Sequence, residues 1–110
     1  MEKTTILPYQ PLKNNIVVEG IKEVKTIITL DDKPREDHKL FVVAISPRVR
    51  DIEKSLELGM RVVLDPHLVE HATWELKFEK GKDSEGKDLK DRIFFEVEYQ
   101  ALRGIWLEEE

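Results

Sequence analysis

The chain of 110 residues contains no cysteine, few aromatic residues (7%) and no long apolar run. Without cysteine it forms neither disulfides nor thiolate metal sites, which is typical of proteins of the reducing cytoplasm. Its apolar runs are far shorter than the about 20 residues of a membrane-spanning helix, and its first residues lack the apolar core of a signal peptide. We therefore expect a soluble cytoplasmic protein without membrane contact.

An excess of basic residues is also missing, because 18 Lys and Arg stand against 23 Asp and Glu, a net charge of -5. Proteins that bind nucleic acid need a basic surface for the phosphates, so the sequence predicts no nucleic-acid partner. Hydrophobic residues make up 40% of the chain, which is enough for one core. The length fits a single domain spanning residues 1–110.

Three segments rich in apolar residues predict strands. Residues 56–66 are the most informative, because Gly59 permits a turn before a run of β-branched residues. Residues 15–19 predict a first strand that ends at Gly20. Residues 40–45 lack alternation, as in a strand buried on both faces.

Residues 73–79 and 93–99 alternate between apolar and polar side chains, the period of a half-buried strand. A polar loop separates them, so we predict one long hairpin over residues 73–99. Its apolar positions are Trp74, Leu76, Phe78, Ile93, Phe95, Val97 and Tyr99. Residues 105–107 predict a last short strand.

Two segments permit several conformations. Residues 48–57 fit one or two helical turns ending near Gly59, or a plain loop, because Ile52 and Leu56 lie four positions apart. Residues 21–32 fit a strand, a short helix or an apolar loop. With six or seven short strands and almost no helix, the sequence predicts an all-β fold, either a barrel or a sandwich.

Three short patterns resemble catalytic motifs but favour ordinary surface structure. Residues 67–71 spell H-x-x-E-H, a zinc spacing, yet they lie between strands and lack a third ligand downstream. Residues 81–87 match G-x-x-x-x-G-K, but Asp88 follows where a phosphate loop needs Ser or Thr. Glu96 and Glu98 share one face of a strand, where carboxylates are ordinarily solvated. We therefore expect no enzyme activity, no cofactor and no bound metal.

Several segments are informative through their order along the chain. Residues 11–18 place a Pro-Leu pair and polar residues before a valine-rich strand, and residues 40–45 and 58–64 supply two further strands. Residues 95–97 and 101–108 end the chain with two strands and a turn. This succession resembles that of the GroES-type co-chaperonins over most of the chain. Each segment alone is degenerate, so the specificity lies in their order.

The resemblance implies a small irregular β-barrel that forms a ring, commonly a heptamer, and caps a chaperonin ring during ATP-driven protein folding. The cap itself hydrolyses nothing. In this family a mobile loop after the first strand docks on the chaperonin through an apolar tripeptide, and by position that loop is residues 20–38 here. Its apolar cluster contains Ile27, Ile28 and Leu30, so either Ile27 with Ile28 or Ile28 with Leu30 would make the contact.

The resemblance also places the terminal strands at the subunit interface, with Trp106 and Leu107 among its apolar contacts. The chain departs from the family pattern, because paired glycines before the tripeptide are absent, the roof hairpin is reduced to residues 47–56 and the hairpin over residues 74–97 is longer. Such remodelling is similar to that of the divergent co-chaperonins encoded by phages. The alternative is a barrel of this type reused as a structural or adaptor protein, for instance in a phage particle, with the long hairpin as its binding surface.

Overall fold

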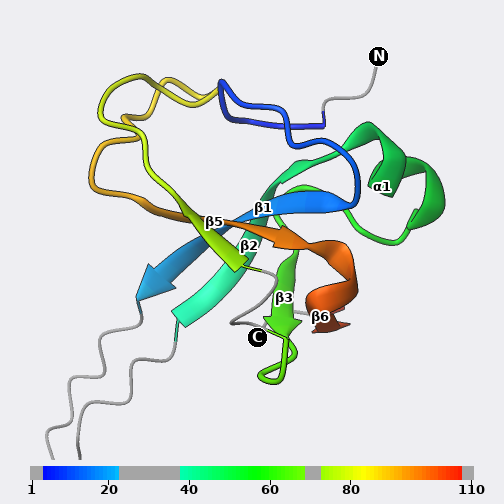
Figure 1. Ribbon diagram of the computed structural model, residues 1–110. Helices are drawn as coiled ribbons and strands as arrows, with labels where there is room; N and C mark the ends of the chain where they lie inside the picture. Colours follow the sequence, from blue (N-terminus) through cyan, green and yellow to red (C-terminus); the bar gives the residue numbers. More distant parts are fainter. Residues whose placement is uncertain (1–3, 23–37, 69–72, 108–110) are drawn as a thin grey trace, which may run out of the picture.

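The structure, a computed structural model, describes residues 4–22, 38–68 and 73–107. Within these ranges six strands form one antiparallel sheet in the order β4-β5-β1-β2-β3-β6 (Figure 1). The strands are β1 (Asn15–Lys22), β2 (His38–Ile45), β3 (Arg61–Leu64), β4 (Thr73–Leu76), β5 (Ile93–Glu98) and β6 (Leu102–Ile105). The described residues also form a short helix, α1 (Pro47–Ile52), and a 3₁₀ turn, η1 (Tyr99–Ala101).

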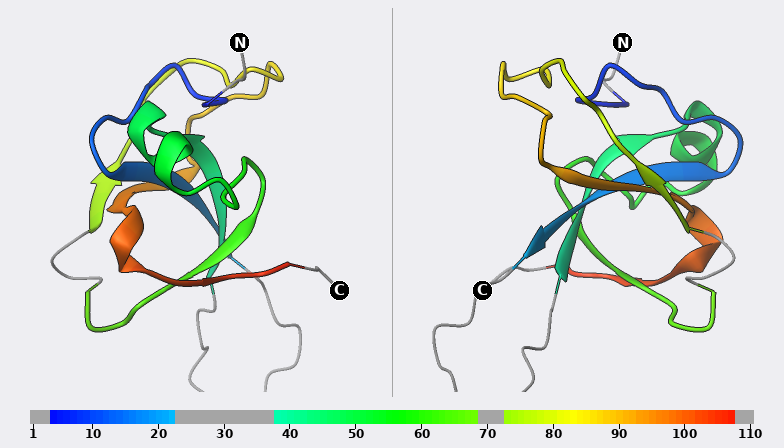
Figure 2. Two further views of the ribbon diagram at one scale, coloured as in Figure 1. Left: turned by 90° about the vertical axis from the view of Figure 1, so that its right-hand side faces the viewer. Right: turned by 60° about the vertical axis from the view of Figure 1, so that its left-hand side comes forward.

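The predicted all-β class with little helix is confirmed. The sheet curves strongly (Figure 2), but a closed barrel does not form over the described ranges. Strands β4 and β6 stand at the two ends of the pairing order and do not pair with each other. The chain passes from β5 through η1 into β6, and β6 then pairs with β3. One edge of β4 and one edge of β6 therefore have no neighbouring strand in the part of the chain that the structure describes.

Strand β2 is buried on both faces, as its unbroken apolar run predicts. Val42 faces the concave side of the sheet, whereas Val43 and Ala44 face the other side. The register shifts at this point, because Val17 pairs with Ala44 but Val18 pairs with Val42. An extra residue in one strand of a pair is a β-bulge, which bends the strand and explains why alternation is absent from the sequence here.

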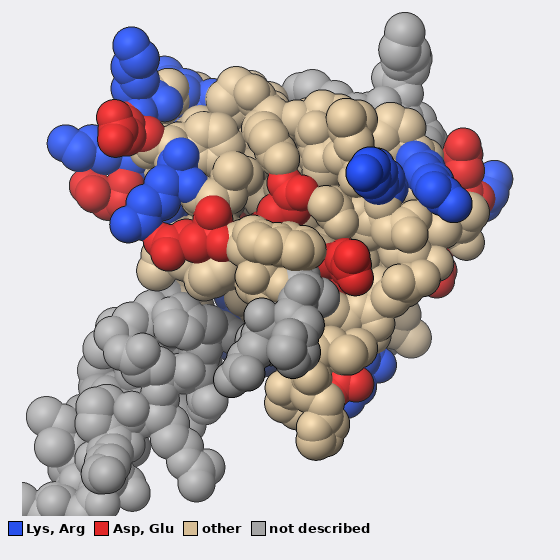
Figure 3. All heavy atoms as spheres, in the orientation of Figure 1, with Lys and Arg blue, Asp and Glu red and all other residues tan. Residues whose placement is uncertain are grey.

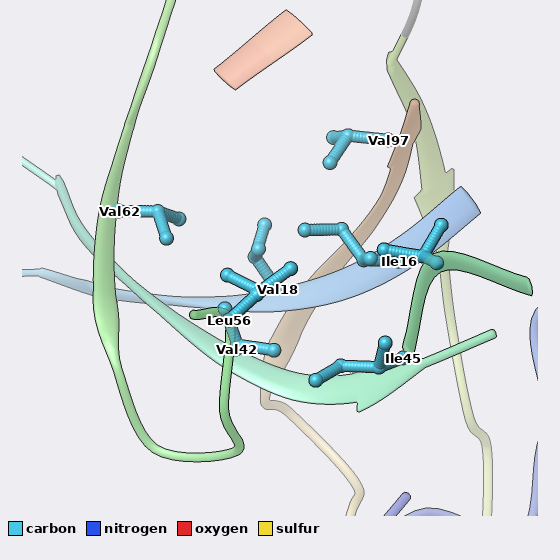
Figure 4. Close-up of a cluster of buried hydrophobic side chains, with 8 residues drawn as sticks. Ile16, Val18, Val42, Ile45, Leu56, Val62 and Val97 are labelled. Carbon is cyan, nitrogen blue, oxygen red and sulfur yellow. The ribbon is translucent and has the colours of Figure 1, made fainter. Parts of the chain in front are cut away.

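The inner core lies on the concave side of the sheet. Its buried side chains come from four strands, from α1 and from the loop after α1, and those drawn in Figure 4 point toward one another. They are Ile16, Val18, Val42, Ile45, Val49, Leu56, Val62 and Val97. Most are β-branched, which suits side chains that pack on a pleated sheet.

The outer core lies on the opposite side of the sheet, where chain segments that are not strands cover it. It comprises Leu7, Val17, Val43, Ala44, Leu89 and Phe94. Leu7 belongs to residues 4–12, here called the N-terminal strap, and Leu89 belongs to the loop of the β4–β5 hairpin. The strap and the hairpin loop lie side by side (Figure 2), and the Ser84 N–H donates to the Ile6 carbonyl at 2.8 Å.

The connection between β2 and β3 contains both a helix and a glycine turn. Helix α1 forms because the Ser46 hydroxyl accepts a hydrogen bond from the Val49 N–H at 3.1 Å and so caps the helix. The helix ends at Ile52, before the predicted limit near Gly59. Gly59 has a φ of 87°, a conformation that favours glycine, so the predicted turn before β3 is confirmed.

Candidate functional site

Residues 20–38, the segment predicted to bind a chaperonin, begin and end in paired strands. The prediction that β1 ends at Gly20 is wrong, because this residue has strand partners in both β2 and β5. It continues to Lys22, whose partner in β2 is His38. The predicted contact residues Ile27, Ile28 and Leu30 lie outside the described residues. The two points at which this segment joins the sheet are therefore neighbours in space.

The two residues predicted at the subunit interface lie on the surface after β6. Trp106 is 49% exposed and Leu107 is 84% exposed. The strand covers Leu102–Ile105, earlier than the predicted residues 105–107, because η1 redirects the chain toward β3. The Arg61 guanidinium lies over the Trp106 ring, 4.8 Å from its centroid, and the backbone N–H of Trp106 donates to the Arg61 carbonyl at 2.9 Å. The tryptophan is thus oriented while half of it faces solvent.

Strands β4 and β5 pair antiparallel, as in the predicted hairpin over residues 73–99, but β4 ends at Leu76 and β5 at Glu98, before the predicted strand limits of 79 and 99. The register places Leu76 opposite Phe94 and Trp74 opposite Glu96. The apolar positions of β4 therefore face the side of the outer core, whereas those of β5 face the inner core. Phe94, which the alternation assigns to the polar face, is wholly buried because the strap and the hairpin loop cover that side.

Beyond the β4–β5 ladder, both limbs of the hairpin line a recess of about 650 Å³, and the limbs pair again where Lys82 meets Asp88. Phe78 and Ile93 form the apolar part of the recess. The Phe78 ring meets the Phe94 ring edge-on, with centroids 5.5 Å apart. The other lining residues are Glu75, Lys77, Glu79, Lys90, Asp91 and Arg92. Because both signs of charge line it, the recess does not select for an anion or a cation.

Arg92 joins three parts of the molecule through its guanidinium group. Its Nε and Nη2 donate to the two carboxylate oxygens of Glu19 in β1 at 2.8 and 2.7 Å, and its Nη1 donates to Asp83 Oδ2 at 2.8 Å. The guanidinium also lies over the Phe94 ring, 5.2 Å from the centroid. Hydrogen bonds to Glu19 and Asp83 raise the pKa of Arg92 above its ordinary high value. A bidentate contact of this kind fixes the hairpin loop against β1.

Residues 81–87, which match the phosphate-loop pattern, form the turn of the hairpin, as predicted. Asp83 Oδ1 accepts hydrogen bonds from the Glu85 N–H at 2.9 Å and from the Lys87 N–H at 3.0 Å. The Arg92 guanidinium and these backbone donors hold the pKa of Asp83 below its usual range. Strand β5 follows instead of a helix, and the carboxylate occupies backbone N–H groups that a phosphate would need. This turn is therefore not a phosphate-binding loop.

Glu96 is a hydrogen-bonded group, which corrects its prediction as a solvated surface carboxylate. The Tyr9 hydroxyl donates to Glu96 Oε1, and the Asn15 side-chain amide donates to Glu96 Oε2 at 2.6 Å. The hydrogen bond to Glu96, with burial and the charge of Glu96 as further causes, raises the pKa of Tyr9. Glu98, the next residue on the same face, forms no ion pair within the described part of the chain. Glu96 thus attaches the strap to β5.

The H-x-x-E-H pattern begins in a turn after β3. Asp65 Oδ1 accepts a hydrogen bond from the His67 N–H at 2.9 Å, and the Leu68 N–H donates to the Asp65 carbonyl at 3.0 Å. Residues 69–72, which complete the pattern, lie outside the described residues. Across ranges 4–22, 38–68 and 73–107, no cluster of three His, Asp or Glu side chains could hold a metal ion. Within these ranges no helix combines the length and the apolar character needed to cross a membrane.

Sequence reasoning missed the polar contacts of Tyr9, Asp83 and Arg92. Tyr9 and Glu96 are 87 positions apart, and Arg92 and Glu19 are 73 positions apart, so no local periodicity relates them. Asp83 lies between two glycines in the sequence, a position that predicts hydrogen bonds with nearby backbone groups. This position does not predict the contact with Arg92.

A scan against protein-family models, a search of curated proteins and a search of solved structures each found no match.

Proposed function

We propose that the chain is a co-chaperonin, a GroES-type subunit that caps a GroEL-like chaperonin ring and assists ATP-dependent protein folding. The order of segments along the chain suggests this role, and the pairing of Lys22 with His38 is the observation that supports it best. Residues 23–37 connect these two partners, so both ends of the segment are fixed at one end of the β1–β2 ladder. A binding segment held in this way meets its partner at a defined place on the domain.

The residues of this segment suit a weak apolar contact. Ile27, Ile28 and Leu30 are its apolar cluster, and charged residues follow it. A short apolar segment binds weakly by itself because ordering it costs conformational entropy. Several copies on one ring bind together, and the effective concentration of each further copy then raises the total affinity.

Assembly into a homo-oligomeric ring, commonly a heptamer in the family that the chain resembles, is part of the proposal. Trp106 and Leu107 are exposed in the single subunit and are the proposed apolar contacts between neighbours. A ring needs two different surfaces that meet head to tail, because only a heterologous interface repeats around a closed circle. In this role the chain is not an enzyme, uses no cofactor, contacts neither nucleic acid nor membrane, and works in the cytoplasm, which is the host cytoplasm if a phage encodes it.

The test is ATP-dependent binding to a purified chaperonin, measured by co-sedimentation, for the wild type and for Ile28→Asp. Burying an unpaired carboxylate in an apolar groove is costly, so we expect the variant to bind about tenfold more weakly or worse. Leu12→Asp is the matched control, because Leu12 is 64% exposed and lies outside the proposed binding segment. Circular dichroism and sedimentation velocity check that both variants keep the fold and the assembly of the wild type.

Equal binding by the wild type and Ile28→Asp would remove Ile28 from the contact. Absence of wild-type binding to several chaperonins would favour the second candidate, a structural or adaptor protein. One observation supports that alternative: the β4–β5 hairpin is fixed by Arg92 and has a half-exposed tryptophan, Trp74, on its edge strand. A fixed hairpin with an exposed aromatic residue suits a binding surface.

A further inference from the structure

Among the described residues, strand β4 has one edge without a strand neighbour. It lies at the end of the sheet and pairs through Thr73–Leu76 with β5. Of the backbone hydrogen bonds among described residues, none outside this ladder reaches β4. An edge strand of this kind presents unpaired backbone N–H and C=O groups, which is the requirement for adding an extended peptide as a further strand.

The side chains near this edge combine one aromatic ring with two carboxylates. Trp74 is 50% exposed and lies opposite Glu96, so the two side chains share one face of the sheet. Glu98 follows two positions later in β5 and therefore lies on the same face. Glu96 accepts hydrogen bonds from neutral groups alone, those of Tyr9 and Asn15. Neither carboxylate is neutralised by a Lys or Arg of the described residues.

The surface near β4 carries both signs of charge, because Lys77 Nζ lies 3.4 Å from Glu75 Oε1 and pairs with it, whereas Glu98 has no such partner among the described residues. In the orientation of Figure 1, acidic side chains lie in the middle of the molecular face shown in Figure 3, where β4, β5 and β1 cross. Lys and Arg lie toward the margins of that face, together with further acidic side chains. Carboxylates that lack a basic partner beside a strand edge are complementary to a cationic segment.

We propose that the free edge of β4 binds an extended, basic polypeptide segment. The backbone of that segment adds to β4 as a seventh strand, an Arg side chain stacks on Trp74, and a second basic side chain pairs with Glu98. The chain already contains the same stacking geometry elsewhere, since Arg61 lies 4.8 Å from the centroid of Trp106. This surface lies on a different strand from the proposed chaperonin contact, so it extends the proposed function and does not depend on it.

The test uses Trp106→Phe, in which Trp74 is the single tryptophan of the chain. The probe is an eight-residue peptide of alternating Arg and Val, compared with a peptide of alternating Glu and Val. We expect the emission of Trp74 to change saturably with the Arg peptide alone, and the binding to weaken as salt is added because it depends on charge. Calorimetry then measures the same peptide with Trp74→Ala in the wild-type background, where we expect binding about tenfold weaker.

Glu98→Gln tests the charge contact, and Glu57→Gln is the control with the same change of charge at an exposed residue outside the hairpin. We expect Glu98→Gln to weaken the Arg peptide by about twofold to fivefold and Glu57→Gln to leave it unchanged. No saturable binding, equal binding of the Glu peptide, or equal effects of the two substitutions would each overturn the proposal. Sedimentation showing that wild-type subunits associate and that Trp74→Ala subunits do not would assign the edge to a second copy of the chain, and would overturn it too.

Discussion

The inner core and the outer core are built on the same strands but are closed in different ways. In the inner core, side chains from four strands meet one another across the concave side of the sheet, and α1 and the loop after it contribute one side chain each. In the outer core, side chains from three strands meet the strap and the hairpin loop, which are irregular segments. Hydrophobic patterning alone is sufficient for the first arrangement, because the curvature of the sheet brings apolar faces together.

The outer core needs polar contacts to hold its cover in place. The strap is attached by backbone hydrogen bonds to β2, from the Ile6 N–H to the Val43 carbonyl and from the Ile45 N–H to the Thr4 carbonyl, and by the Tyr9 hydrogen bond to Glu96. The hairpin loop is attached by the Arg92 contacts with Glu19 and Asp83. Both sets of side-chain contacts end on the outer face of the β1–β5 pair. Charge and pH therefore affect the outer core directly and the inner core only through cooperative unfolding.

We expect the greatest loss of stability when a buried leucine is replaced in either core. Leu56 in the inner core and Leu89 in the outer core are both 0% exposed. Each Leu→Ala substitution leaves a cavity, so we expect each to lower the free energy of unfolding by about 2–5 kcal/mol, measured by urea denaturation. Leu12→Ala, at a residue that is 64% exposed, is the control and should have little effect. A much smaller loss for Leu89→Ala than for Leu56→Ala would show that the outer core is loosely packed.

A second, smaller effect concerns acid pH and the outer core alone. Because its pKa is lowered in the folded state, Asp83 contributes stability that is present above its unfolded-state pKa of about 3.9 and is lost as pH falls below it. The hydrogen bond from Arg92 is the main cause. In urea midpoints measured from pH 7 to acid pH, Arg92→Met should therefore lose less stability across this window than the wild type, although it is less stable at pH 7.

The control for this pH series is Arg103→Met, which removes the same charge from an exposed position in β6. Its midpoints should fall in parallel with those of the wild type. If Arg92→Met also gave a parallel curve, the acid loss of stability would come from carboxylates other than Asp83.

The smallest effect concerns the strap at alkaline pH. Because its pKa is raised, Tyr9 contributes stability that is present below its unfolded-state pKa of about 10 and is lost as pH rises through the folded value. Tyr9→Phe should cost about 1 kcal/mol at pH 7 by removing one hydrogen bond, and should flatten the alkaline part of the stability curve. Tyr99→Phe, at the other tyrosine of the chain, should keep that alkaline loss. Identical alkaline curves for Tyr9→Phe and the wild type would place the loss elsewhere.

Much of the fold could be predicted because its signals are local. The β-branched run at residues 16–18 and the alternation at residues 73–76 specify strands wherever they pack. Gly59 and Ser46 specify a turn and a helix cap through their own backbone and side chain. The sequence placed the end of β1 at Gly20 because glycine weakens the interior of a strand. In the structure, Gly20 stays in the strand because it pairs with both β2 and β5.

The candidate site was less predictable, because its contacts join residues far apart in the sequence. The alternation in β5 predicted a strand, but it assigned Phe94 to the polar face, since nothing local shows that a strap and a loop cover that face. The half exposure of Trp74 likewise follows from the position of β4 at the edge of the sheet, which is a property of the strand order. Burial of a particular face is decided by what packs on it.

The amino-acid sequence by itself therefore determined the all-β class, the hairpin and the turns, because backbone preferences and side-chain periodicity act over a few residues. Only the folded structure shows that β4 and β6 do not pair with each other over the described ranges, that the two faces of the sheet both become cores, and that Arg92 reaches Glu19 and Asp83. These outcomes depend on strand order and on contacts between distant segments, and such contacts exist only once the chain has folded.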